Sequence, residues 1–204
     1  MRIIFHFLDR MRIKMTYLMD KIQTEYGYSD YQIRLIRFTF TAVLYDISKV
    51  FLFAIYFYLT GKLMEFLFAV VPLILLRTKT GGMHMQKYWS CLVFSFAYIY
   101  TCINILPHII TVPCLFVFLI LLMCAVIDYC IGPTSLKKKP SECKDFIQKA
   151  KMQTFQVIFF VAVLFFIFPK NQYLFISFWT VVLHTLQLSI TKILKEVNYC
   201  EKLA

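Results

Sequence analysis

The chain has 204 residues and a formal net charge of +11; 60% of its residues are hydrophobic and only 16% are charged. A soluble domain is typically about 45–50% apolar and about 25% charged, so a soluble globular domain, a disordered chain and a coiled-coil rod are excluded. Seven cysteines are neither dense nor even in number, which excludes a small disulfide scaffold. We therefore expect an all-α integral membrane protein, a single domain over 1–204, whose basic residues face a membrane surface and no nucleic acid.

The first segment, 1–28, predicts an amphipathic helix. Apolar residues recur at three- and four-residue steps from Ile4 to Tyr26, and charged residues fill the positions between them. The apolar run Ile3–Leu8 is too short for the core of a signal peptide, so we expect none. Such a helix lies in the membrane interface, although a solvated helix packed on the protein's own loops fits the same pattern.

The next helix is predicted to start at Asp30. Gly27 is a typical helix stop, and Ser29 with Gln32 matches a capping box.

Six apolar stretches predict six membrane spans, at 39–60, 63–76, 88–106, 109–131, 152–168 and 171–190. A full crossing needs about 20 apolar residues. The second stretch makes only about 21 Å of helix against about 30 Å of hydrocarbon, and Pro72 is expected to kink it. Its shortness leaves room for the following connection to lie below the membrane surface.

The distribution of lysine and arginine along the chain predicts how the protein is oriented in the membrane. The N-terminal arm, the connection after the second span, the basic loop 132–151 and the C-terminal tail hold 19 of the 22 basic residues, and the other three connections hold two. The positive-inside rule then places both termini in the cytoplasm of a multi-pass cell-membrane protein.

The segment 77–91 holds a constellation that suits thiol chemistry. It contains Arg77, the adjacent Gly81 and Gly82, His84 and Cys91. A thiolate is the nucleophilic form of cysteine, and an imidazole can accept its proton and later return it to a leaving amine. The cytoplasm keeps thiols reduced, so we interpret 77–91 as a catalytic loop that runs into the third span.

The spacing sets a geometric condition. In one straight helix His84 and Cys91 would be about 10.5 Å apart along the axis, too far for proton transfer at about 3 Å. The pair therefore requires the chain around Gly82–Lys87 to fold back, which is tolerated where backbone is buried in protein or lines a wet cavity. From spacing alone, packing roles for Cys91 and His84 stay open.

These residues resemble the accessory gene regulator B (AgrB) family of membrane peptidases that mature quorum-sensing peptides. The motif is an arginine, then Gly-Gly-x-His, then a cysteine seven residues after the histidine, here Arg77, Gly81, Gly82, His84 and Cys91. The Pro- and Lys-rich segment 132–140 also resembles the family's basic loop. Met85 is a mild departure, because family members more often have a small residue there.

The resemblance implies a cysteine endopeptidase without a cofactor. His84 would activate Cys91, which attacks a peptide bond of a small amphipathic propeptide with an acidic C-terminal tail. The resulting thioester is then captured by an internal cysteine or serine of the peptide to give a thiolactone or lactone. The resemblance also implies a homodimer in the lipid bilayer.

For several residues the sequence allows two interpretations. Arg77 either binds a substrate carboxylate or anchors the helix end at the interface, and Lys137, Lys138 and Lys139 either enforce topology or hold the acidic tail. Asp128 and Gln86 are candidates for the group that orients His84. We expect no metal site, because the other histidines lie in separate segments and no Cys-x-x-Cys pair exists.

Two other functional classes compete with the peptidase. Asp46 and Lys49 lie one helical turn apart in the first span, where charges are often functional, although a structural pair is the favoured interpretation. A small exporter or permease would use Asp46, Lys49 and Asn104 to line a pathway. A non-catalytic adaptor would present the basic loop to a partner.

Overall fold

The computed structural model describes residues 25, 27, 29–81, 88–110, 112–133, 144–169 and 171–201. The chain divides into two compact units, Met1–Phe53 and Ala54–Ala204. The regular elements of the described residues are all helical, which confirms the all-α prediction. The predicted amphipathic helix over 1–28 lies almost entirely outside the described residues.

The described part of the first unit is the long helix α2 (Asp30–Leu59), which continues into the second unit. It starts at the predicted residue, and the backbone N–H of Ile33 donates to the carbonyl of Ser29 at 3.1 Å. Gly27 has a left-handed φ of 65°, as expected of a helix stop. Lys49 Nζ lies 2.8 Å from Asp46 Oδ1, so these two charges form the structural pair that their spacing favoured.

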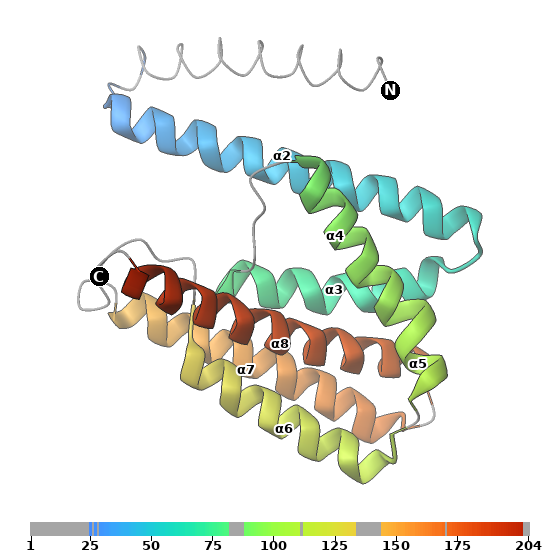
Figure 1. The fold of residues 1–204 in the computed structure, drawn as a ribbon. Helices are drawn as coiled ribbons and strands as arrows, with labels where there is room; N and C mark the ends of the chain where they lie inside the picture. Colours follow the sequence, from blue (N-terminus) through green and yellow to red (C-terminus); the bar gives the residue numbers. More distant parts are fainter. Residues whose placement is uncertain are drawn as a thin grey trace. The chain divides into compact units, whose positions relative to one another are not determined.

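Four helices form the core of the second unit: α3 (Leu63–Thr80), α6 (Cys114–Ile131), α7 (Lys144–Ile167) and α8 (Gln172–Glu201). Their fully buried apolar side chains include Leu76, Val117, Phe165 and Phe178. Helices α3, α6 and α8 run in one direction and α7 in the other, so Thr80, Ile131, Lys144 and the end of α8 lie at the same end of the bundle (Figure 1).

Pro72 shapes the contact between α3 and α8. Proline has no backbone N–H, so the carbonyl of Phe68, four residues earlier, loses its helical donor. The Ser177 hydroxyl of α8 donates to this carbonyl at 2.7 Å. The missing hydrogen bond of α3 is thus replaced by a side chain, which a buried backbone carbonyl requires. The helix is continuous through Pro72 and ends at Thr80, four residues beyond the predicted end of the second span.

Prolines also explain why the helices at the third and fourth predicted spans begin or end at other residues than predicted. Helix α4 (Tyr88–Tyr100) passes into a π-helical turn, η1 (Thr101–Ile105), and a short helix, α5 (Leu106–Ile109). Pro107 cannot donate in the regular helical pattern, and π-turns are typical of such interruptions. The fourth span was predicted from 109, but α6 starts at Cys114 because Pro113 takes the position before its first turn.

The corner between α6 and α7 depends on Gly132. Its φ of 68° is left-handed, and a β-carbon there would lie 2.8 Å from Cε of Lys151. Lys151 extends its ammonium over the ring of Tyr129, 5.0 Å from the ring centre. The first residue of the predicted basic loop therefore packs directly against α7.

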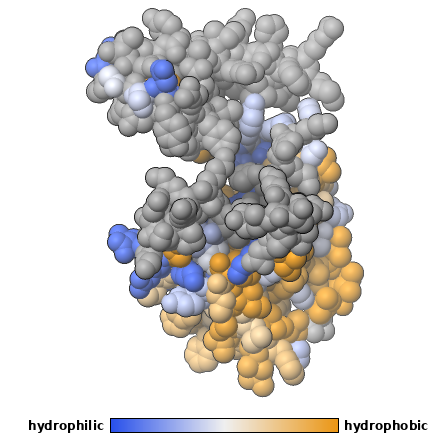
Figure 2. All heavy atoms as spheres, turned by 60° about the vertical axis from the view of Figure 1, so that its left-hand side comes forward, coloured by the Kyte–Doolittle hydropathy of each residue, from blue (hydrophilic) through white to orange (hydrophobic). Residues whose placement is uncertain are grey.

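Four helical segments among the described residues are long and apolar enough to cross a membrane: Tyr88–Ile109, Cys114–Ile131, Ile147–Ile167 and Gln172–Leu194. Helix α3 carries Glu65, Arg77 and Lys79, so its uncharged stretch runs only over 66–76. Apolar side chains gather over the lower part of the view in Figure 2. On α6, the exposed residues Leu115, Leu119, Leu122 and Val126 form a stripe. A face of this kind is typical of contact with lipid. Six crossings remain a prediction.

Candidate active site

The motif residues that the structure describes lie at two helix ends. Arg77 is in the last turn of α3, and Gly81 is the residue that follows this helix. The Gly81 N–H donates to the Arg77 carbonyl at 2.9 Å, and its φ of 79° is left-handed. With ψ at −160° this conformation is almost restricted to glycine, and a residue with a β-carbon would lose about 1–3 kcal/mol there. The helix-ending geometry gives Gly81 a physical role whatever the chemistry of the loop.

Cys91 lies in the first turn of α4 and is only 4% exposed. It forms no disulfide. Trp89 and Ser90 are in the same first turn, and the first N–H groups of a helix have no carbonyl partner within the helix. A thiol and backbone donors of this kind therefore belong to the same helix turn.

The remaining residues of the predicted constellation fall outside the described residues: Gly82, His84, Gln86, Lys137, Lys138 and Lys139. The described part of α4 begins at Tyr88, four residues after His84. The required approach of His84 to Cys91 therefore remains a prediction.

A histidine outside the predicted constellation lies buried at the end of α3. Nε2 of His184 is 2.9 Å from the Thr80 hydroxyl, and both side chains are about 1% exposed. The same hydroxyl donates to the Leu76 carbonyl at 2.9 Å. The Thr80 hydroxyl therefore links the imidazole of α8 to the last turn of α3. Through this contact, His184 of α8 fixes Thr80, the residue just before Gly81.

Asp128 belongs to the same buried polar region. It is 1% exposed, and neither carboxylate oxygen has a hydrogen-bond partner among the described residues. The Thr185 hydroxyl lies close to this carboxylate but outside hydrogen-bond geometry. Arg77 lies near His184 and Tyr98, and the Tyr98 hydroxyl donates to the Thr180 carbonyl at 2.9 Å. These polar groups come from α3, α4, α6 and α8.

The sequence did carry a signal for His184. It stands in the apolar stretch of α8, where an ionisable residue is itself a reason to expect a function. Spacing within 77–91 could not show that α8 passes the end of α3. The long-range pairing of Thr80 with His184 appears only in the fold.

The polar residues that an exporter would use have other partners among the described residues. Asp46 and Lys49 pair with each other, and the Asn104 side chain accepts from Lys62 Nζ. Each of these polar side chains is thus engaged with a protein partner.

In the comparison with protein families, the sequence model of the family described as accessory gene regulator B aligns with residues 15–188. The matched range contains the whole of 77–91, the basic loop 132–151 and His184. The search of curated proteins and the search of solved structures gave no match.

Proposed function

Because the chain belongs to the accessory gene regulator B family, which takes part in the processing of quorum-sensing propeptides, we propose that it is a membrane-embedded cysteine endopeptidase. In this proposal Cys91 is the nucleophile and His84 is the general base. The substrate is a small amphipathic propeptide with an acidic C-terminal tail, and the product is a cyclic thiolactone or lactone peptide. No metal or cofactor takes part.

The reaction proceeds in two acyl transfers. His84 takes the proton of Cys91, the sulfur attacks the scissile carbonyl, and the C–N bond breaks as His84 returns the proton to the leaving amine. The N-terminal part of the propeptide remains on Cys91 as a thioester. An internal cysteine or serine of the peptide then attacks this carbonyl, closes the ring and releases Cys91.

The observation that carries the proposal is the position of Cys91, buried in the first turn of α4 and seven residues after the motif histidine. Burial excludes water, which would hydrolyse the thioester to a linear product. A thiol tethered in the same peptide has a high effective concentration and favours cyclisation. The N–H groups of Trp89 and Ser90 are candidate donors to the oxyanion.

The other motif residues receive supporting roles in the proposal. Gly81 and Gly82 let the chain turn from α3 toward α4. Lys137, Lys138 and Lys139 attract the acidic tail, and Arg77 binds a carboxylate or fixes the loop. Asp128 and Gln86 remain the two candidates for orienting His84.

The proposed topology has six crossings, an interfacial N-terminal helix and both termini in the cytoplasm. It is supported by the common end of the bundle at which α3, α6 and α8 finish and α7 begins, since these are the ends next to the basic connections. The catalytic loop 77–91 and the basic loop 132–151 would then face the same compartment. We further propose a homodimer, as the family resemblance implies.

The test is cleavage of the cognate propeptide, sought in the neighbouring reading frame, by variants reconstituted in vesicles. Cys91→Ala and His84→Ala are expected to abolish cleavage while the protein remains in the membrane. Cys130→Ala and His108→Ala, at exposed positions on α6 and α5, are the matched controls and should retain it. Normal cleavage by Cys91→Ala would refute the proposal.

The alternative is a small exporter or permease of a peptide without proteolytic activity. It predicts that changes at Asp46, Lys49 or Asn104 abolish activity while Cys91→Ala preserves it. The same set of variants therefore separates the two functions.

A further inference from the structure

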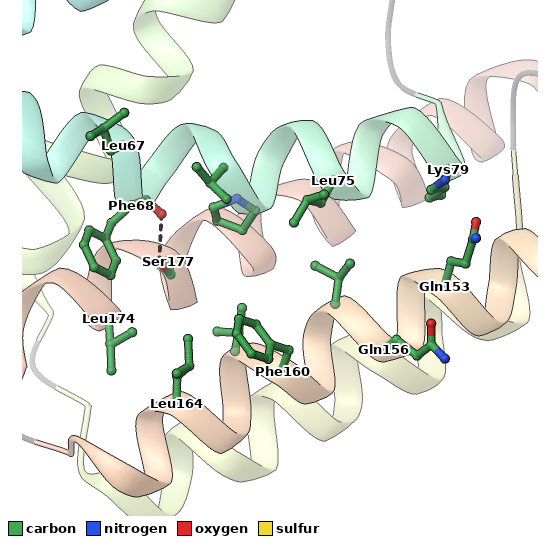
Figure 3. Close-up of a pocket in the computed structure, with 14 residues that line it drawn as sticks. Leu67, Phe68, Leu75, Lys79, Gln153, Gln156, Phe160, Leu164, Leu174 and Ser177 are labelled. Carbon is green, nitrogen blue, oxygen red and sulfur yellow. Dashed lines mark hydrogen bonds between the residues drawn. The ribbon is translucent and has the colours of Figure 1, made fainter.

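A groove of about 620 Å³ runs along the outside of the bundle between α3 and α7, with α8 behind it. Its volume lies within the range of small-molecule sites, about 300–1,000 Å³. Most of its wall is aliphatic or aromatic, from Leu67 at one end to Gln153 at the other (Figure 3). Leu75 and Phe160 lie on its open side and are exposed.

The apolar part of this groove has no free side-chain polar group to offer a ligand. The Ser177 hydroxyl is the polar side chain there, and it already donates to the Phe68 carbonyl (Figure 3). A ligand that fills this part must therefore be apolar itself, because a polar group would be desolvated without a partner.

The polar side chains of the groove gather at its other end. Lys79 in the last turn of α3 faces Gln153 of α7, and Gln156 lies one turn further along α7 (Figure 3). They offer one ammonium and two amide groups, all hydrogen-bond donors. No carboxylate lines the groove among the described residues. This end is therefore complementary to an anion.

The groove lies along a helix that is suited to cross the membrane. Residues 153–164 of α7 belong to the candidate span Ile147–Ile167. The open side would face hydrocarbon, and the Lys79 end lies at the basic end of the bundle, where the headgroups are expected.

From this arrangement we propose that the groove binds an anionic phospholipid, with one acyl chain along the apolar wall and the phosphate at Lys79, Gln153 and Gln156. An acyl chain has no polar atoms and leaves nothing unpaired. An extended peptide would place its N–H and C=O groups against a wall without partners, which is costly in an apolar environment. The position of Lys79, two residues before Gly81, means that a bound lipid would pack beside the start of the candidate catalytic loop.

The test uses the full chain purified in detergent and measures retained phosphatidylglycerol by native mass spectrometry, with phosphatidylcholine as the competing neutral lipid. The headgroup variant is Lys79→Ala, matched by Lys192→Ala on α8. The groove-filling variant is Leu75→Trp, matched by Leu122→Trp on the exposed face of α6. The measurement needs no propeptide, so its outcome is independent of the proposed cleavage.

Phosphatidylglycerol is expected to be retained in preference to phosphatidylcholine. Lys79→Ala should lower this preference about fivefold, the factor for one lysine at an anionic surface, and Leu75→Trp should abolish retention of either lipid. Lys192→Ala and Leu122→Trp should behave as the unchanged protein. Equal retention by all four variants overturns the proposal. So does cross-linking of the cognate propeptide, in place of lipid, to a photoreactive residue at position 75 in vesicles.

Discussion

The imidazole Nε2 of His184 lies 2.9 Å from the hydroxyl of Thr80, which joins α8 to the last residue of α3. Thr80→Val keeps the size of the side chain and removes the hydroxyl, so it leaves a buried imidazole nitrogen without its partner. Such a loss typically destabilises a protein by about 1–3 kcal/mol. We expect a lower midpoint of thermal unfolding in detergent and slower propeptide cleavage, because Gly81 and the candidate loop follow directly.

Thr80→Ser is the matched control for this contact, since it retains the hydroxyl. It is expected to recover most of the stability and of the cleavage rate. If valine and serine at this position have the same effect on both measurements, the hydrogen bond to His184 does not hold the end of α3.

The hydrogen bond from Ser177 to the Phe68 carbonyl predicts that a change at Pro72 compensates for the loss of the serine hydroxyl. Ser177→Ala leaves the Phe68 carbonyl without a donor and should destabilise the protein by about 1–3 kcal/mol. Pro72→Ala restores a backbone N–H four residues after Phe68 and so supplies the missing helical hydrogen bond.

The measurement is a double-mutant cycle of thermal or denaturant unfolding. Ser177→Ala should be much less destabilising in the Pro72→Ala background than in the unchanged protein. Additive effects of the two changes would show that the serine does not compensate for the proline.

Two glycines allow backbone strain to be distinguished from a side-chain clash. Gly61 and Gly132 both have left-handed φ values, 70° and 68°. A β-carbon added at Gly61 would have no neighbour within 4 Å, whereas one added at Gly132 would meet the Lys151 side chain. Gly61→Ala should therefore destabilise through the backbone alone, by about 1–2 kcal/mol. Gly132→Ala should be worse, because Lys151 must also leave Tyr129.

Unfolding measurements on Gly61→Ala, Gly132→Ala and the Gly132→Ala/Lys151→Ala double variant check this difference. To isolate the clash, Lys151→Ala alone serves as the reference for the double variant. Relative to that reference, Gly132→Ala should fall to the backbone cost alone, about 1–3 kcal/mol for a residue whose ψ is −171°. A penalty that stays larger would place its cause elsewhere in the corner.

Lys137, Lys138 and Lys139 lie outside the described residues, so their proposed role is tested through enzyme kinetics. Replacing all three with glutamine should raise KM for a propeptide with an acidic tail and leave kcat nearly unchanged, because the contact precedes the chemistry. The difference should shrink as salt rises, since screening weakens exposed charges. An unchanged KM at low salt would assign these lysines to topology alone.

Each of the six predicted apolar stretches lies largely in a helix of the described residues, but the helix ends differ, and six membrane crossings stay a prediction. Helix α7 begins at Lys144, well before the predicted 152, and α8 continues to Glu201, beyond the predicted 190. Both extensions are rich in polar residues. A search for apolar stretches finds the part of a helix that crosses hydrocarbon and misses the polar turns that continue it. Pro107 and Pro113 account for the differing boundary between the third and fourth spans, for a steric reason already visible in the sequence.

Of the candidate site, the sequence predicted only the part that depends on residues close together along the chain. Arg77, Gly81 and Cys91 are at helix ends because glycine stops α3 and a new helix begins at Tyr88. The pairing of Thr80 with His184 spans 104 residues, and only the parallel packing of α3 and α8 brings the two together. The place of Asp128 near the end of a span is visible in the sequence, but its burial beside Thr185 depends on the packing of α6 against α8.

The most direct test of the peptidase mechanism is the covalent intermediate on Cys91. The full chain in vesicles is mixed with a propeptide whose internal cysteine is replaced by alanine, quenched in acid and examined by intact and peptide mass spectrometry. We predict an adduct of the propeptide without its tail on the peptide that contains Cys91, released by hydroxylamine and absent in Cys91→Ala. Tail release without an adduct at Cys91, or with undiminished rate in Cys91→Ala, would contradict the mechanism.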